Sequence, residues 1–325
     1  MNDKLTLEQL PNEIFEELFE YFDIYELYRT FSQLNIRISS LLTNFKYLQV
    51  IFYTPEDIDL RVNRYFLPKT KTLIINHTKS FYDPIKINLI SHIRCLILCQ
   101  PTREQWISIQ PLYFPYLERL YLINSRFVYR TEQLCDLIFS NKFPYLYSCS
   151  LPHVSYELNN QWTYSLNLQS LQIKIWDIRV YTQILDACPK LIHLKIELNG
   201  GNSQENIQVL HSNKNHSVLR YLALYLSNPI THDFIDSILS FIPHLEYFVL
   251  DVKYQRPSSI SLNTLASILE YRTPRLNRIH INITLPKNLC CKEQMDTKYS
   301  LFTSYKIQHE VNQLTRFIIV GSVRE

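Results

Sequence analysis

Apolar side chains in the first fifty residues recur at helical spacing in three short groups. The first group has two adjacent stripes at four-residue intervals, formed by Ile14, Leu18 and Phe22 and by Phe15 and Phe19. Pro11 stands where this helix should begin, a position that tolerates proline because its missing N–H would have no partner. The other two groups are Leu27, Phe31 and Leu34, then Ile38, Leu41, Leu42 and Phe45. Three short helices need less apolar surface than this for their own core, and the surplus indicates a partner.

After residue 60 the pattern changes to a short phrase, apolar-x-x-apolar-x-apolar, usually with a proline two residues before its first apolar position. Leu117, Leu120 and Leu122 form one clear copy. Copies are anchored at residues 70, 93, 117, 146, 168, 191, 219, 245, 276 and 314. Most intervals between anchors lie within or near the about 20–29 residues of leucine-rich repeats. The phrase therefore predicts a repeat protein in which each copy supplies a short strand.

Helical spacing falls between these anchors, in residues 131–138, 181–185, 231–239 and 262–269. Strands alternating with helices predict βα units whose parallel strands stack into a solenoid. We therefore predict an α/β chain, with a small three-helix domain at residues 1–50 and a leucine-rich-repeat-like βα solenoid at residues 60–325. The asparagine or cysteine usual eight residues after the anchor is present only as Asn199, so the repeat is degenerate.

The alternative to a solenoid is an α/β sheet without solenoid order. A dinucleotide-binding sheet would need clustered glycines, and the chain has only Gly200, Gly201 and Gly321. The same scarcity argues against a phosphate-binding loop.

The strand phase separates two sets of side chains in each copy. The anchor and the positions three and five residues later should face the helices, and positions two, four and six residues later should lie on the open concave face. This second set is rich in tyrosine and charge, and rigid solenoid faces commonly bind partners. We predict that it binds a target protein through Arg119, Tyr121, His193, Lys195, Tyr221, Tyr225, Tyr247 and Arg278. An ordinary solvated sheet face is the alternative for each of these residues.

Two short motifs stand out in the first fifty residues, Leu10-Pro11 and Tyr21-Phe22-Asp23. They resemble the Leu-Pro opening and the aromatic-Leu/Phe-Asp junction of the F-box family, whose members dock onto a ubiquitin ligase. Leu34 to Ile38 takes the place of a Val-Cys-Lys-Arg-Trp-like segment, with Ile38 where an aromatic residue is customary and Ile36 where a polar one is. F-box proteins with leucine-rich repeats commonly carry degenerate, helix-containing units, so the two resemblances support each other. A generic helical cap on a repeat domain is the alternative.

The F-box resemblance implies a substrate-recognition adaptor of a cullin-RING ubiquitin ligase of the SCF type. The F-box would bind the Skp-type adaptor through Leu10, Pro11, Ile14, Leu18 and Phe22, and the solenoid would hold an unknown target protein. Catalysis would reside in other subunits, so we expect no enzyme activity and no cofactor. The departures at Ile36 and Ile38 leave open a leucine-rich-repeat interaction scaffold with a non-functional F-box and no ubiquitin role.

Composition excludes several other classes. Hydrophobic residues make up 46% and charged residues 19% of the chain, as in a globular protein. A net charge of +3 is too small to indicate a nucleic-acid surface, and no apolar run approaches the about 18 residues of a membrane span. The seven cysteines include no Cys-x-x-Cys pair, and no signal-peptide pattern is present, so we expect reduced thiols in a cytosolic or nuclear protein. No metal-binding or acid–base motif emerges, although a hydrolase whose site assembles only in space stays open.

Overall fold

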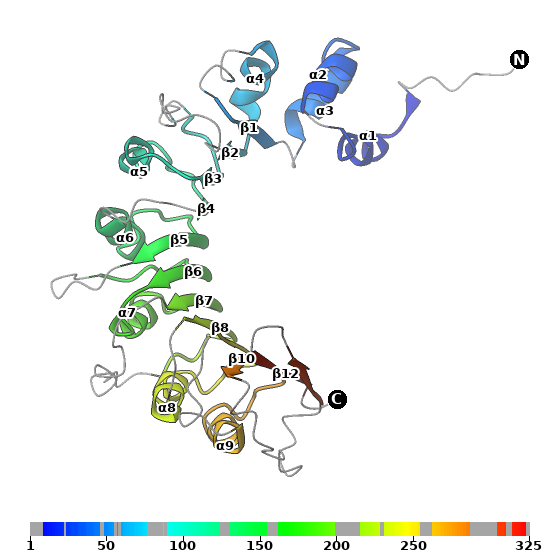
Figure 1. Cartoon of the computed structure of the whole chain (residues 1–325). Coiled ribbons are helices and arrows are strands. Elements are labelled where there is room, and N and C mark those ends of the chain that lie inside the picture. Colours follow the sequence, from blue (N-terminus) through cyan, green and yellow to red (C-terminus); the bar gives the residue numbers. More distant parts are fainter. Residues whose placement is uncertain are drawn as a thin grey trace, which may run out of the picture. The chain divides into compact units, whose positions relative to one another are not determined.

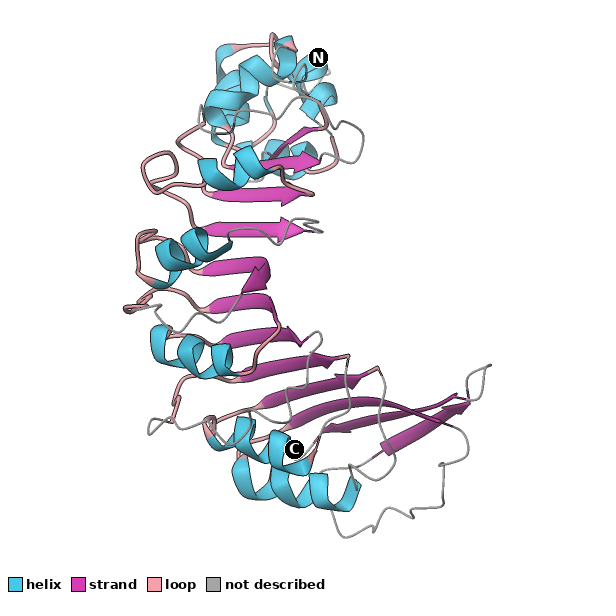
Figure 2. Ribbon diagram, turned by 60° about the vertical axis from the view of Figure 1, so that its left-hand side comes forward, coloured by secondary structure: helices cyan, strands magenta, loops and turns pink. Residues whose placement is uncertain are grey.

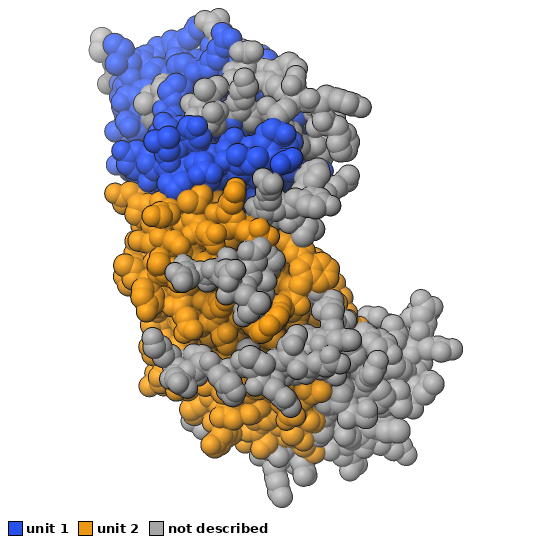
Figure 3. Space-filling view, turned by 90° about the vertical axis from the view of Figure 1, so that its left-hand side faces the viewer, with its two compact units in different colours: residues 1–127 blue, residues 128–325 orange. Residues whose placement is uncertain are grey.

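The computed structural model of the chain describes residues 9–22, 24–45, 49–54, 57, 60–76, 87, 90–123, 131–154, 162–198, 215–227, 231–253, 262–286, 304–309 and 314–322. Figure 1 shows the helices and strands of the chain, and Figure 3 shows its two compact units, residues 1–127 and 128–325. This division falls well beyond the boundary predicted at residues 50–60. The first parallel strands therefore share a unit with the amino-terminal helices.

Three helices begin the first unit, α1 (Asn12–Phe19), α2 (Ile24–Phe31) and α3 (Ile36–Asn44). Their buried sides meet around Phe19, whose ring centroid lies 5.2 Å from that of Phe31 and 5.6 Å from that of Phe45. Pro11 lies one position before α1, so this helix begins one residue later than the sequence predicts. Asn35 caps α3, because its side-chain oxygen accepts a hydrogen bond of 2.8 Å from the backbone N–H of Ile38.

The first unit continues with four parallel strands, β1 (Gln49–Phe52), β2 (Thr72–Asn76), β3 (Cys95–Cys99) and β4 (Arg119–Ile123). Between them lie α4 (Arg61–Phe66), the 3-10 helix η3 (Leu67–Lys69) and α5 (Arg103–Ser108). Helix α5 is short but well capped, because Thr102 and Gln105 exchange hydrogen bonds between side chain and backbone. The pairing of β1 with β2 shows that the parallel strands start before residue 60.

The second unit contains six strands in parallel order, β5 (Ser148–Val154), β6 (Ser170–Ile175), β7 (His193–Leu198), β8 (Tyr221–Leu226), β9 (Tyr247–Val252) and β10 (Arg278–Pro286). Its helices are α6 (Thr131–Phe139), α7 (Arg179–Ala187), α8 (His232–Ser240) and α9 (Leu262–Arg272). Figure 2 shows these helices along one face of the strands. The four helical segments predicted between the anchors are confirmed, each within three residues of its bounds.

The predicted strand phase is also confirmed. On β7, Leu194 and Ile196 are fully buried on the side of the helices. The alternate residues differ, because His193 is exposed and Lys195 is half-buried. The anchor Leu191 is fully buried as well. Each strand of the second unit therefore presents one apolar face to the helices and one mixed face, here called the outer face, to the other side.

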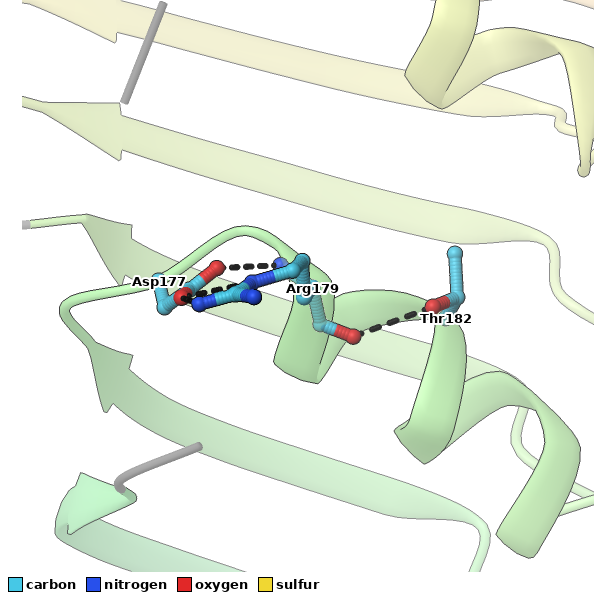
Figure 4. Close-up of polar contacts among 3 residues, drawn as sticks. All are labelled: Asp177, Arg179 and Thr182. Atoms are coloured by element: carbon cyan, nitrogen blue, oxygen red, sulfur yellow. Dashed lines mark hydrogen bonds and ion pairs between the residues drawn. The ribbon is translucent and has the colours of Figure 1, made fainter. Parts of the chain in front are cut away.

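Polar contacts fix where two of these helices begin. At the start of α7, Asp177 accepts hydrogen bonds of 2.8 Å from the backbone N–H and from Nε of Arg179, and the Thr182 hydroxyl donates to the Arg179 carbonyl at 3.0 Å (Figure 4). The Thr231 hydroxyl caps α8 by accepting from the Phe234 N–H at 3.3 Å. Such caps satisfy backbone donors that a short helix cannot satisfy internally.

The carboxyl-terminal end of the fold departs from the prediction. Residue 314, predicted as a repeat anchor, begins β12 (Leu314–Ser322), which pairs antiparallel with β10 and with β11 (Ser304–His309). The parallel order of the strands therefore stops at β10, and the predicted solenoid does not continue to residue 325. Strands β11 and β12 are separated by only four residues, 310–313, too few for the crossover that a parallel pair needs, so these two strands can pair only in opposite directions.

Candidate protein-interaction surfaces

Helix α1 has one side in the core and one side outside it. Phe15 and Phe19 are fully buried, whereas Ile14 is 44% exposed and Leu18 is half-buried. The two stripes predicted from the sequence therefore differ in role. The stripe with Ile14 and Leu18 leaves apolar surface on the outside of a small helical unit.

The Leu-Pro segment before α1 is held against α3 by Arg37. One guanidinium nitrogen of Arg37 donates to the Leu10 carbonyl at 2.6 Å and to the Asn12 side-chain oxygen at 2.7 Å. Leu10 is half-buried and Pro11 is exposed. These contacts set the position at which the chain enters α1.

Phe22 behaves differently from the other predicted adaptor contacts. It is half-buried, and its ring centroid lies 5.5 Å from that of Phe31, in edge-on geometry. Asp23, the last residue of the matched junction, lies outside the described residues. Phe22, which follows α1, therefore packs against α2 and also contributes to the surface.

A hollow of about 720 Å³ lies between these helices and β1, a feature that the sequence reasoning missed. Its lining is largely aromatic and apolar, with Glu20 as its charged member, and consists of Phe19, Glu20, Phe22, Ile24, Tyr25, Leu27, Phe45, Gln49, Ile51 and Tyr53. The β-branched and aromatic run Val50-Ile51-Phe52-Tyr53 is a strand signal that lies before the predicted start of the repeats.

The outer face of the second unit is ordered in rows, because the parallel strands pair in register. The first row, at the amino-terminal ends of the strands, consists of Ser148, Ser170, His193, Tyr221, Tyr247 and Arg278. The middle row consists of Ser150, Gln172, Lys195, Ala223, Val249 and His280. The last row consists of Lys174, Glu197, Tyr225, Asp251 and Asn282.

Aromatic rings stand next to one another along the first row. The His193 and Tyr221 ring centroids are 5.8 Å apart, and those of Tyr221 and Tyr247 are 5.1 Å apart with perpendicular planes. Burial raises the pKa of the Tyr221 hydroxyl above its ordinary value, and Tyr225 and Tyr247 add to the effect. Tyr221 is thus a neutral hydroxyl donor at physiological pH.

The middle and last rows place polar groups in contact. The Lys195 ammonium lies 4.9 Å from the centroid of the Tyr225 ring. Lys174 pairs with Glu197 at 3.0 Å, and the Asn282 amide donates to Asp251 at 3.0 Å. Ala223 and Val249 of the middle row are buried although they lie on the outer face, so this face is not open at every position.

The structure divides the predicted target-binding residues between the two units. His193, Lys195, Tyr221, Tyr225, Tyr247 and Arg278 share the outer face of the second unit. Arg119 and Tyr121 are half-buried residues of β4 and belong to the first unit. The candidate site described here is therefore formed by the first six.

A histidine–tryptophan pair near this face was also missed. The Trp176 indole N–H donates to Nε2 of the buried His153 at 3.0 Å, and the two rings stack with centroids 5.1 Å apart. Burial lowers the pKa of His153, and the charge of Lys174 lowers it further. The recurring apolar phrase could not predict this pair, because the pairing of β5 with β6 shifts register between Leu151 and Val154.

The described residues were also compared with the requirements of a metal site, a membrane-spanning helix and a reactive thiol. Among them, no three histidine, cysteine, aspartate or glutamate side chains come together as a metal site, and no helix is both long and apolar enough to cross a membrane. Burial raises the pKa of the thiols of Cys135, Cys149 and Cys188, which disfavours the reactive thiolate. Asn199, the asparagine found eight residues after a repeat anchor, lies outside the described residues.

No protein-family model and no curated protein sequence matches this chain. The interpretation of its surfaces therefore depends on the residues themselves.

Proposed function

We propose that this chain is a substrate-recognition adaptor of a cullin-RING ubiquitin ligase, with residues 1–50 binding the Skp-type adaptor and the outer face of the second unit binding a target protein. The observation that carries the first part is the division of α1. Phe15 and Phe19 fill the helical core, while Ile14 and Pro11 are exposed and Leu18 is half-buried. An apolar stripe left outside so small a core is the feature that an adaptor would cover.

The outer face supplies the second part of the proposal. Its aromatic residues and its arginine are the residue types that dominate binding energy in protein interfaces. They lie on strands held from behind by a buried apolar layer, so little backbone conformational freedom would be lost on binding.

An interaction scaffold with a non-functional F-box is the alternative, and Ile36 favours it. This apolar side chain is 90% exposed at a position where F-box proteins usually carry a polar residue. Ile38, by contrast, is 1% exposed and fills the core position that an aromatic residue usually takes. The substitution at Ile38 thus preserves a packing role.

The adaptor proposal is tested with Leu18→Glu, which places a charge in the proposed interface. A charge buried without a partner costs several kcal/mol, so co-purification with a Skp-type adaptor should be lost. Ile14→Glu should give the same result, and Leu166→Glu, at a position 47% exposed in the second unit, is the matched control. If folded Leu18→Glu and Ile14→Glu proteins both retain the adaptor, residues 1–50 do not act as proposed.

Target binding is tested separately with the combined variant Tyr221→Ala and Tyr247→Ala. This protein should keep its fold and its adaptor, yet lose partners that co-purify through the second unit. Comparing the proteins captured by wild type and variant decides the matter. Retention of every such partner would move the target site away from the outer face.

A further inference from the structure

Charges are distributed unevenly over the outer face of the second unit. Arg278 lies in the first row and Lys195 in the middle row. None of the twelve positions in these two rows is aspartate or glutamate. The acidic residues of the face, Glu197 and Asp251, lie in the last row. Each already has a polar partner at 3.0 Å, Lys174 for the first and Asn282 for the second.

The charges of Lys195 and Arg278 are available to a ligand, whereas the carboxylates of Glu197 and Asp251 already have polar partners. In the part of the chain that the structure describes, neither Lys195 nor Arg278 forms an ion pair. Arg278 is exposed, and Lys195 is half-buried with its ammonium over the Tyr225 ring. Between these cations lie the rings of Tyr221 and Tyr247, also half-buried. Two cationic side chains with aromatic rings between them favour an anionic ligand that also has some apolar surface.

We propose that the first and middle rows from β7 to β10 bind an extended acidic segment of the target protein. One glutamate or aspartate carboxylate would pair with Arg278 and another with Lys195, and the chain between them would lie on the tyrosine rings. The inference depends on the proposed function only for the existence of a target, because the site can be examined without the adaptor.

The dimensions of the face suit such a segment. Neighbouring strands lie about 4.8 Å apart, so the three intervals from β7 to β10 span about 14 Å. Lys195 and Arg278 also differ by one row along the strands. An extended chain advances about 3.4 Å per residue, so about five residues bridge the two cations. Both side chains are long, and they tolerate small differences in this spacing.

The same rows suit a nucleic acid poorly. A phosphate backbone carries one charge per nucleotide, and a site for it needs a larger set of cations than Lys195 and Arg278. The carboxylates of Glu197 and Asp251 lie one row away from Lys195 and would repel additional phosphates. An acidic peptide, by contrast, can place its few charges over the first and middle rows and keep them away from Glu197 and Asp251.

The test uses the full chain and fluorescence anisotropy with labelled ten-residue peptides of repeating Glu-Ser, Gln-Ser or Lys-Ser. A labelled ten-nucleotide thymidine strand is the competing probe. The site variant combines Lys195→Gln with Arg278→Gln. The control combines Lys142→Gln with Lys253→Gln, which removes the same charge from exposed positions outside the two rows.

We expect wild type to bind the Glu-Ser peptide at least tenfold more tightly than the Gln-Ser and Lys-Ser peptides. The site variant should lose at least tenfold in affinity for it, and the control variant less than twofold. Raising NaCl from 50 to 300 mM should weaken binding by wild type, because charge pairing is screened. A second variant, Tyr221→Ala with Tyr247→Ala, should weaken binding severalfold while both cations remain.

Three results would overturn the inference. They are the absence of Glu-Ser binding by wild type, equal binding by the site and control variants, and tighter binding of the thymidine strand through Lys195 and Arg278. None of these results bears on adaptor binding by residues 1–50, so a failure here is distinguishable from a failure of the ligase proposal.

Discussion

The hydroxyl of Tyr181 on α7 donates a hydrogen bond of 3.1 Å to the backbone carbonyl of Ile238 on α8. Both residues are fully buried, and burial raises the pKa of the Tyr181 hydroxyl far above its ordinary value. This contact joins the helix that follows β6 to the helix that follows β8, although β7 lies between these two strands in the sheet. It therefore links two helices whose strands do not pair with each other.

Removing that hydroxyl should measurably weaken the second unit. Tyr181→Phe is expected to lower the free energy of unfolding by about 1 kcal/mol, because a buried hydrogen bond is lost while the packing is retained. Urea unfolding followed by circular dichroism measures the change. Tyr164→Phe, at a position 57% exposed, is the matched control and should have almost no effect. Equal stability of Tyr181→Phe and wild type would show that this bond contributes nothing net.

The strand phase predicts a sharp contrast between neighbouring positions. Leu194→Ala or Leu245→Ala should each cost about 2–5 kcal/mol, because both side chains are fully buried and the truncation leaves a cavity. Lys195→Ala and Tyr247→Ala, on the outer face, should cost far less. Denaturant midpoints of the four variants test this. A similar loss in both pairs would mean that the outer face packs as tightly as the helix side.

The stability of the second unit should decrease in mild acid through His216. This buried imidazole accepts a hydrogen bond of 3.1 Å at Nδ1 from the Leu219 N–H, and its Nε2 lies 2.9 Å from the Cys188 carbonyl. Burial lowers the pKa of His216 below 6.5, so the unfolded chain takes up a proton at higher pH than the folded chain does. The contribution is therefore fully present above pH 6.5 and is lost as the pH falls towards the folded-state pKa.

Unfolding free energies measured at intervals from pH 8 to pH 5 test this, with His216→Gln beside wild type. The wild-type curve should fall more steeply below pH 6.5 than the curve of the variant. His153, whose pKa burial also lowers, should contribute with the same sign to both proteins. Parallel curves would exclude His216 as a source of the acid sensitivity.

Helices α8 and α9 should be coupled by a modest ionic contact. Arg272 binds Asp236 with two hydrogen bonds, of 2.7 and 2.6 Å, but each side chain is about one-third exposed (33% and 35%). A double-mutant cycle with Arg272→Gln and Asp236→Asn should therefore give a coupling of about 0.5–1 kcal/mol. The coupling should shrink at 1 M NaCl. A coupling unaffected by salt would indicate that the geometry of the two hydrogen bonds, and not charge, joins the helices.

Much of the βα architecture follows from local pattern alone. Strand side chains alternate by geometry, so the apolar positions of the recurring phrase had to face one side and the tyrosines and charges the other. The helices α6 to α9 lie where apolar residues recur at helical spacing. Residues 12–44 form three helices for the same reason, and the stripe of Phe15 and Phe19 is the buried one because it meets Phe31 and Phe45.

Only the tertiary structure decided which strands pair and which side chains meet. The phrase at Leu314 looks like one more repeat, yet β12 pairs antiparallel with β10, because direction depends on the connection between strands and not on their composition. Likewise, Arg119 has the same phase as His193 but belongs to the other compact unit. The contact of Trp176 with His153 joins a residue of β5 to the residue directly after β6, where a register shift changes which atoms come within reach. Alternation along a strand is a local property, whereas pairing across strands depends on the length and course of the segments between them.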